Sequence, residues 1–270
     1  MAIFSAKKTD ALDQTCVFIF RGDIMDSIEK LAQLIKEAKH TVFFGGAGVS
    51  TASGIPDFRS ANGLYSGKHK YSPETMLSHT FFIQHTDLFF QFYRSSMIYP
   101  NAKPNAAHKA LALLEQNNKL AAIITQNIDG LHQAAGAKNV LELHGSVHRN
   151  YCMECGAHYD LNYVLKTDGI PHCSKCGGIV KPDVVLYEEA LDEGVIYQSI
   201  DHIRKADLLI IGGTSLVVYP AASFVDECRG KIVLINKDAT YRDNIADLVI
   251  HESIDYVLDE AVRIEQKLQD

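Results

Sequence analysis

The stretch GAGVSTASGIPDFRS, residues 46–60, directly follows the apolar run TVFFG at 41–45. A strand that opens onto glycines usually approaches a phosphate-bearing ligand, because glycine lets the backbone come close to the phosphate. Thr51 stands where the third glycine of the G-x-G-x-x-G dinucleotide pattern would be. The acidic ribose-binding residue expected about 20 residues further on also has no clear counterpart. The loop therefore indicates a nucleotide site but disfavours an ordinary hydride-transfer dehydrogenase.

Further apolar runs flanked by turn residues alternate with helical patterns along the chain. The expected strands are AAIIT (121–125), VLEL (140–143), LLIIG (208–212), KIVLI (231–235) and LVI (248–250). Helices are expected over 26–40, 104–117, 219–229 and near 255–268. Strands that are apolar on both faces and alternate with helices predict an α/β fold with a doubly wound sheet.

Two segments interrupt this alternation and are predicted to be insertions. Residues 55–103 are aromatic-rich and helical, and residues 148–182 are rich in Cys, Gly and turn residues. The remaining parts, 26–54, 104–147 and 183–270, are assigned to the large domain. Residues 1–25 are expected to be an N-terminal extension, of which 1–22 match no clear element.

Four of the six cysteines form two close pairs, Cys152-x2-Cys155 and Cys173-x2-Cys176, separated by seventeen residues. This is the spacing of a four-thiolate zinc ribbon, in which each pair directs two sulfurs at one point. Four thiolates leave no open coordination position, so the predicted zinc is structural and not catalytic.

The composition and net charge indicate which kinds of molecule the protein is expected to bind. The chain has 270 residues, is 47% hydrophobic and carries a formal net charge of −7. That balance disfavours nucleic-acid binding, which usually needs a basic face. No apolar run approaches the ~20 residues of a membrane span, and the N-terminus does not resemble a signal peptide. We therefore expect a cytoplasmic protein without direct nucleic-acid or membrane partners.

Polar side chains follow two neighbouring predicted strands. Gln126, Asn127 and Asp129 come after the run at 121–125, and His144 comes after the run at 140–143. Ligands of open α/β sheets bind at the carboxyl ends of the strands, and histidine transfers protons near neutral pH. The alternative is structural, because Asn and Asp often cap helices and a histidine can be a turn residue. The turns at 212–215 and 235–238 end other strands and could contact the same extended dinucleotide.

The motifs GAGVSTASGIPDFRS, TQNIDGLH, LHG, the two Cys-x2-Cys pairs, GTS and INKD occur in the order found in sirtuins, and the chain resembles this family over residues 26–265. The resemblance implies a Rossmann-like domain plus a smaller domain made of a zinc ribbon and a helical insert. It also implies an NAD-dependent protein lysine deacetylase that transfers the acetyl group to ADP-ribose and releases nicotinamide. The implied partners are acetylated lysine side chains of proteins, with NAD as co-substrate.

The resemblance also implies residue roles, with His144 as the general base of the acetyl transfer. The implied NAD contacts are Ala47, Gly48, Thr51, Asp57, Phe58, Arg59, Gln126, Asn127, Ile128, Asp129, His144, Thr214, Ser215, Asn236, Ser253 and Ile254. Val185 and Tyr187 are expected to line the acyl-lysine tunnel. Sirtuins commonly carry Val-x-Phe-Gly-Glu here, whereas this chain has Glu188 at the glycine position.

Two further comparisons bear on the reaction. Sirtuins that accept acidic acyl groups share a Tyr-x-x-Arg pair, and here Tyr93 is followed by Ser96 at the arginine position. Short neutral acyl groups are therefore expected. Two alternatives stay open: a mono-ADP-ribosyltransferase on the same fold, and a zinc-ribbon adaptor that binds acyl-lysine or nucleotide without turnover.

Overall fold

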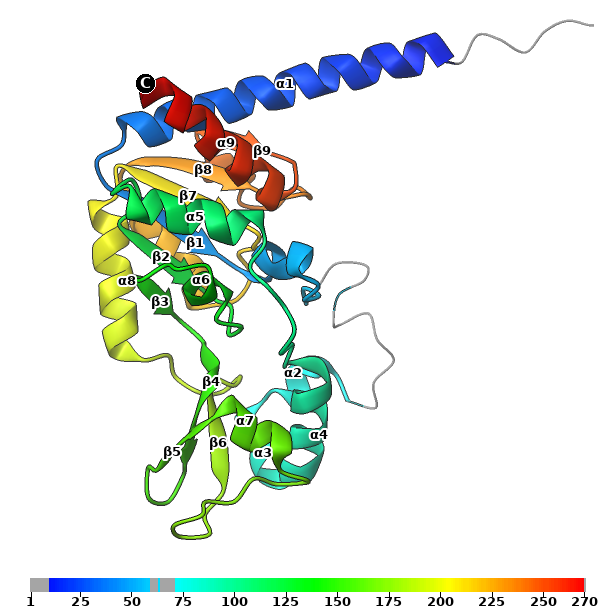
Figure 1. Ribbon diagram of the computed structural model, residues 1–270, viewed down its shortest axis with the longest axis vertical. Coiled ribbons are helices and arrows are strands. Elements are labelled where there is room, and N and C mark those ends of the chain that lie inside the picture. Colours follow the sequence, from blue (N-terminus) through cyan, green and yellow to red (C-terminus); the bar gives the residue numbers. More distant parts are fainter. Residues whose placement is uncertain (1–9, 59–62, 64–70, 270) are drawn as a thin grey trace, which may run out of the picture.

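The computed structural model describes residues 10–58, 63 and 71–269. Its larger part is a six-stranded parallel sheet in the order β3-β2-β1-β7-β8-β9 (Figure 1). The chain winds outward from β1 to one edge and from β7 to the other, so the winding direction reverses between these two strands. The strands are β1 (Thr41–Gly45), β2 (Ala122–Thr125), β3 (Val140–Glu142), β7 (Leu208–Gly212), β8 (Lys231–Ile235) and β9 (Leu248–Ile250).

Helices cover both faces of this sheet, which confirms the doubly wound α/β prediction. One face packs against α1 (Asp10–Glu37), α5 (Ala106–Gln116) and α9 (Ile254–Gln269), and α6 (Leu131–Ala134) lies near α5. The other packs against α8 (Glu193–Lys205) and the 3₁₀ helix η3 (Ala221–Glu227). Successive side chains of β1 alternate between the two cores, with Phe43 in the first and Val42 and Phe44 in the second.

Two expected helices differ from the structure. Helix α1 begins at Asp10, so the expectations that residues 10–22 form no element and that a helix starts near Asp26 are wrong. The hydroxyl of Ser27 donates to the Asp23 carbonyl one turn back, so this residue lies inside a continuing helix and does not cap one. The segment 219–229 is helical only over η3, a tighter 3₁₀ turn in which Ser223 N donates to Pro220 O. Residues 1–9 lie outside the described part of the chain.

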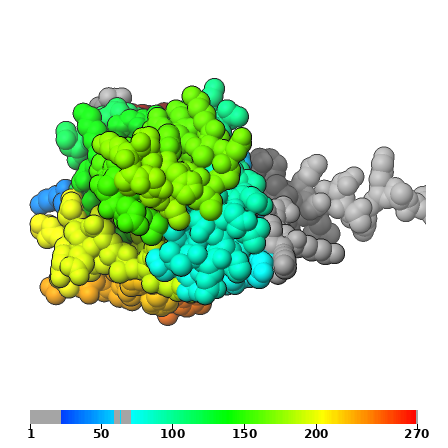
Figure 2. All heavy atoms as spheres, turned by 90° about the horizontal axis from the view of Figure 1, so that it is seen from below, coloured from blue at the N-terminus to red at the C-terminus, as the bar shows by residue number. Residues whose placement is uncertain are grey.

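The two insertions pack together into a smaller domain. The first contributes α2 (Pro73–Met76), α3 (His79–Gln84) and α4 (Thr86–Ser96). The second contributes α7 (Leu161–Lys166) and an antiparallel sheet β5-β4-β6, made of β4 (Gly145–Cys152), β5 (His158–Asp160) and β6 (Val180–Val184). Figure 2 shows this domain from below, with the second insertion in green to lime beside the cyan first insertion.

An aromatic cluster joins the two insertions. Phe82, Phe89 and Phe90 are fully buried and pack against Val164 of α7 and Val184 of β6. The aromatic-rich pattern of the first insertion is therefore explained by its packing on the second. Strands β4 and β6 run through residues 148 and 182, where the sequence placed the limits of the zinc module.

Candidate active site

A cavity of about 990 Å³ lies between the two domains, at the carboxyl ends of β1, β2, β7 and β8. It includes every binding residue expected from the sequence that the structure describes, and Arg59 lies outside the described residues. The lining includes Ala47, Gly48, Thr51, Asp57, Phe58, Gln126, Asn127, Ile128, Asp129, His144, Val185, Tyr187, Thr214, Ser215, Asn236, Ser253 and Ile254. Segments far apart in the sequence thus meet at one site.

The glycine loop after β1 is packed backbone to backbone on the loop after β7. Gly48 N donates to Gly213 O at 2.8 Å. A Cβ at position 48 would lie 2.7 Å from Gly213 Cα, so a side chain there cannot fit without moving the second loop. The first two glycines of the motif therefore serve close backbone approach at the switch point of the sheet. From Ala47 the chain enters the 3₁₀ helix η1 (Ala47–Ser53).

Asn127 and Asp129 are tied together through Ser50. The Ser50 hydroxyl donates to Asp129 Oδ2 at 2.6 Å, and Asn127 Nδ2 donates to Ser50 Oγ at 3.1 Å. Asp129 Oδ1 also accepts the Leu131 amide at 2.9 Å, which orients the carboxylate at the start of α6. Ser50 was not identified from the sequence. The only sequence signal for Ser50 was that it is a polar residue within the glycine loop. The structure shows that it is almost completely buried.

Two buried histidines lie behind this network. The sequence reasoning missed His108, and it included His132 in the TQNIDGLH motif without giving it a role. His108 Nε2 is 3.5 Å from Ser50 Oγ, and the centroid of the His132 ring lies 4.8 Å from that of His108, with the two rings tilted by 59°. Burial lowers the pKa of His108 to about 4, with the nearby Asp129 charge acting in the opposite direction. Burial and the neighbouring His108 lower the pKa of His132 to about 3. Both rings are therefore neutral near pH 7. Neither ring nitrogen of His132 has a hydrogen-bond partner in the described structure.

His144 lies at the junction between β3 and β4, on the wall between the two domains. Its Nδ1 is 3.0 Å from the Gln126 carbonyl oxygen. A carbonyl can only accept, so Nδ1 carries the proton and the neutral ring keeps an unprotonated Nε2. Burial lowers the pKa of His144 below its usual range, although the hydrogen bond to Gln126 acts in the opposite direction. The ring is thus prepared to accept a proton at Nε2 near neutral pH.

The ends of β7 and β8 are joined by a reciprocal pair of hydrogen bonds. Thr214 N donates to Asn236 Oδ1 at 3.1 Å, and Asn236 Nδ2 donates to Thr214 O at 2.6 Å. The Thr214 hydroxyl in turn accepts from Gln126 Nε2 at 3.1 Å. The loops after β2, β7 and β8 are therefore held as one rigid rim, which suits a ligand that extends across several strands.

The opposite wall is formed by the segment after β6. Val185 N donates to His144 O at 3.0 Å, which joins this segment to the general-base candidate. Tyr187 N donates to Leu77 O and Tyr187 O accepts from His79 N, each at 3.0 Å, which joins it to the first insertion. Val185 and Tyr187 both line the cavity, as expected from the sequence.

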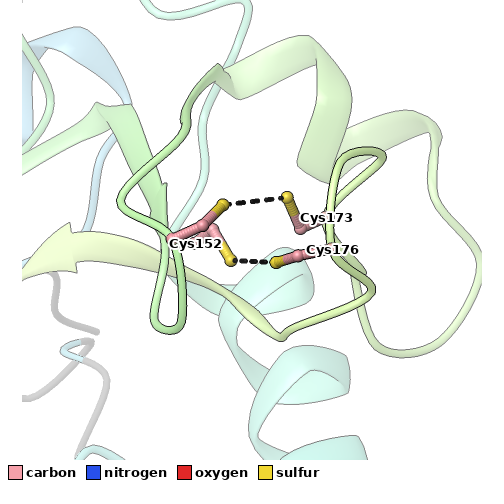
Figure 3. A group of neighbouring side chains, drawn as sticks. Cys152, Cys173 and Cys176 are labelled. Carbon is pink, nitrogen blue, oxygen red and sulfur yellow. Dashed lines mark hydrogen bonds between the residues drawn. The ribbon is translucent and has the colours of Figure 1, made fainter.

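The four cysteines meet at the far end of the smaller domain. Figure 3 shows Cys152, Cys173 and Cys176 pointing toward one another between two loops. All four sulfurs, including that of Cys155, lie within 4.8 Å of one another, and two pairs are 3.4 and 3.6 Å apart. A tetrahedral zinc with Zn–S bonds of about 2.3 Å needs sulfurs about 3.8 Å apart, so this geometry fits one zinc ion. This arrangement of the four sulfurs is consistent with the predicted structural zinc ribbon.

Comparison with known proteins gives one consistent result. The model of the Sir2 family matches residues 46–220. An NAD-dependent protein deacetylase of Clostridium acetobutylicum is 61% identical over 243 residues, covering 88% of this chain and 99% of its own. One of Clostridium perfringens is 61% identical over 241 residues, covering 88% of this chain and 99% of its own.

Solved structures agree with the sequence relatives. A Sir2 homologue–NAD complex superposes with a TM-score of 0.82 at 38% identity, covering 90% of this chain and 95% of the other. A Sir2–p53 peptide–NAD+ complex gives 0.76 at 37% identity, covering 88% and 96%. The family model, the sequence relatives and the solved structures agree, and this chain belongs to the Sir2 family.

Proposed function

We propose that this chain is an NAD-dependent protein lysine deacetylase that transfers the acetyl group of an acetyl-lysine to ADP-ribose and releases nicotinamide. The observation that carries the proposal is His144, whose tautomer leaves a basic Nε2 on a cavity wall shared by the nucleotide loops and the Val185–Tyr187 segment. The cavity is lined both by the nucleotide loops and by the Val185–Tyr187 segment, so it offers separate surfaces for two substrates. Its relatives from the two Clostridium species carry the same activity in their names.

The proposed reaction needs one proton acceptor at the ribose. The acetyl oxygen attacks ribose C1′ as the nicotinamide bond breaks, which gives an alkylimidate joined to ADP-ribose. His144 Nε2 then takes a proton from the ribose hydroxyls, so that the 2′-oxygen can attack the imidate carbon. Water completes the release of free lysine and O-acetyl-ADP-ribose. His144 must be neutral for this step, and the lowered pKa of its ring supplies that state near pH 7.

Other cavity residues are assigned to parts of NAD. Asn127, Ile128 and Asp129 hold the carboxamide and the neighbouring ribose, with Ser50 orienting the Asn127 and Asp129 side chains. Phe58 shields the ribose face after nicotinamide leaves. Contacts to the phosphates and the adenosine end are assigned to Ala47, Gly48, Thr51, Asp57, Arg59, Gln126, Thr214, Ser215, Asn236, Ser253 and Ile254.

The remaining assignments concern organisation and location. We place the large domain at 26–54, 104–147 and 183–270, the cofactor loop and helical insert at 55–103, and the zinc module at 148–182. A cytoplasmic location is supported by four free cysteines gathered at one point, because thiols stay reduced and available for a metal in that compartment. No helix in the described part of the chain is long and apolar enough to cross a bilayer.

The test is single-turnover mass spectrometry with NAD and an acetyl-lysine peptide, comparing the parent with His144→Ala. The parent is expected to give equal amounts of nicotinamide, free-lysine peptide and O-acetyl-ADP-ribose. The variant is expected to lose about 10²–10⁴-fold in turnover, the usual contribution of a positioned general base. Turnover of His144→Ala at the parent rate would refute the role of His144. ADP-ribose attached to protein, without deacetylated peptide, would refute the proposed activity.

A further inference from the structure

Glu188 occupies a backbone position that favours glycine. Residues 186–189 form a turn closed by a hydrogen bond from Glu189 N to Leu186 O at 3.0 Å. Glu188 is the third residue of that turn and has a φ of +75°, in the left-handed region. Turns with a positive φ at this position favour Gly or Asn, because a Cβ is unfavourable there. A charged residue thus stands in a strained position on the wall of the cavity.

The side chain of Glu188 is held in a defined place. Its Oε2 accepts the backbone N–H of Thr80, in the first turn of α3, at 2.8 Å. The hydrogen bonds from Thr80 hold the pKa of the Glu188 carboxyl below its usual range, so the group is ionised near neutral pH. Glu188 is exposed, and it lines the cavity together with the preceding residue, Tyr187.

The two adjacent glutamates differ in how their charges are compensated. Glu189 Oε2 accepts from the buried Lys181 Nζ at 3.1 Å, and its Oε1 lies 2.9 Å from His79 Nδ1. Glu188 forms no ion pair with a lysine or arginine in the described part of the chain. The charge of Glu189 is therefore paired within the protein. Glu188 belongs to the cavity lining, and among the described residues its charge is offset only by the Thr80 hydrogen bonds and the nearby His79.

We propose that Glu188 is a specificity-determining residue that selects acetyl-lysine peptides with an arginine or lysine close to the modified residue. This inference rests on the proposed deacetylase function, because it assigns the peptide to the Val185–Tyr187 side of the cavity. An extended peptide advances about 3.3 Å per residue, so a cationic side chain within three residues of the acetyl-lysine can reach this wall. The selected partner is a basic segment of protein chain.

The test is an arginine scan through one otherwise neutral acetyl-lysine peptide, with one arginine at each of the three positions on either side. The readout is the ratio of kcat/KM for each arginine peptide to that for the neutral peptide, since a ratio cancels any general loss of activity. The parent is expected to show a gain of about two- to fivefold at one or two positions, as for an exposed ion pair. The gain should shrink at high salt, where exposed charges are screened.

Glu188→Gln is the informative variant, because it keeps the shape and the acceptor for Thr80 N but removes the charge. It should lose the arginine gain, and Glu188→Lys should favour an acidic flanking residue instead. Glu193→Gln, at an exposed position of α8, is the matched control and should keep the gain. Equal gains in the parent and Glu188→Gln, or no gain at any position, would overturn the proposal.

Binding of the same fluorescent peptides, measured by anisotropy, separates this inference from the proposed function. An arginine gain in binding that depends on Glu188 supports the specificity role even if no nicotinamide is released. Deacetylation that ignores the flanking charge supports the function and overturns the specificity role.

Discussion

Replacing the buried His132 should make the protein less sensitive to acid. The unfolded chain binds a proton at His132 near pH 6.5, whereas burial and the neighbouring His108 lower the pKa in the folded protein to about 3. The unfolded state therefore takes up the proton first as the pH falls, and folding stability is lost from about pH 6.5 downward. Integrated from pH 7 to pH 5, this single group costs about 2 kcal/mol of unfolding free energy.

His132→Leu removes the titrating group without removing a hydrogen bond, because neither ring nitrogen has a partner in the described structure. The assay is urea unfolding of parent and variant at pH 7 and pH 5 with excess zinc. Any change in packing acts equally at both pH values, so the quantity to compare is the loss of stability between them. The variant should lose about 2 kcal/mol less than the parent.

His158→Leu is the control, because His158 is exposed on β5 and its replacement should leave the pH-dependent loss unchanged. If His132→Leu and the parent lose equal stability between pH 7 and pH 5, His132 is not held neutral by the fold and the reasoning is wrong.

Three further predictions concern the metal, the acyl group and the turn after His144. Cys173→Ala should release zinc and lower stability and activity together, and a metal-free variant of full activity would contradict a structural role for the metal. Acetyl- and propionyl-lysine peptides should have kcat/KM values at least about tenfold above those of a succinyl-lysine peptide, because a buried succinyl carboxylate would lack a cationic partner. Ser96, not arginine, lines the cavity at the expected position, and Arg94 donates to the Val164 and Gly169 carbonyls instead. If the parent enzyme removes succinyl as fast as acetyl, the predicted preference for short neutral acyl groups is wrong. Gly145→Ala should cost about 1–3 kcal/mol of unfolding free energy in urea, since φ is +75° and a Cβ would lie 2.0 Å from the Asp183 carbonyl oxygen. It should also reduce turnover, because Gly145 directly follows His144. If stability and turnover both stay unchanged, this backbone position tolerates a side chain and the reasoning is wrong.

The sheet and the site loops could be predicted because their signals are local. The run at 208–212 is apolar on both faces and ends in glycines, and the structure places it as β7 with the expected bounds. The motif loops follow strands, and parallel strands bring their carboxyl ends to one edge, so the meeting of Asn127, His144 and Thr214 in one cavity follows from the order of elements.

The missed features depend on contacts between distant segments. Ser50 was missed because its role arises only when the loop after β1 contacts Asp129 in the loop after the neighbouring strand β2. The early start of α1 was missed because the Asp26-Ser27 pair resembles a helix cap, and only the Ser27 contact to Asp23 within a longer helix reveals otherwise. The positive φ of Glu188 is not forced by the local sequence, and the only signal for it was the glycine that sirtuins commonly carry at this position.

The pairing of β1 with β7 has a consequence for how the chain folds during synthesis. In this pair Thr41 lies opposite Leu208, with both insertions between them in the sequence. The switch point of the sheet therefore cannot close until most of the polypeptide has left the ribosome, whereas β4, β5 and β6 pair over much shorter separations. The zinc-binding sheet can thus form while the loop after β1 still waits for its partner. We expect nascent chains that end before β7 to hold metal but to lack the nucleotide rim.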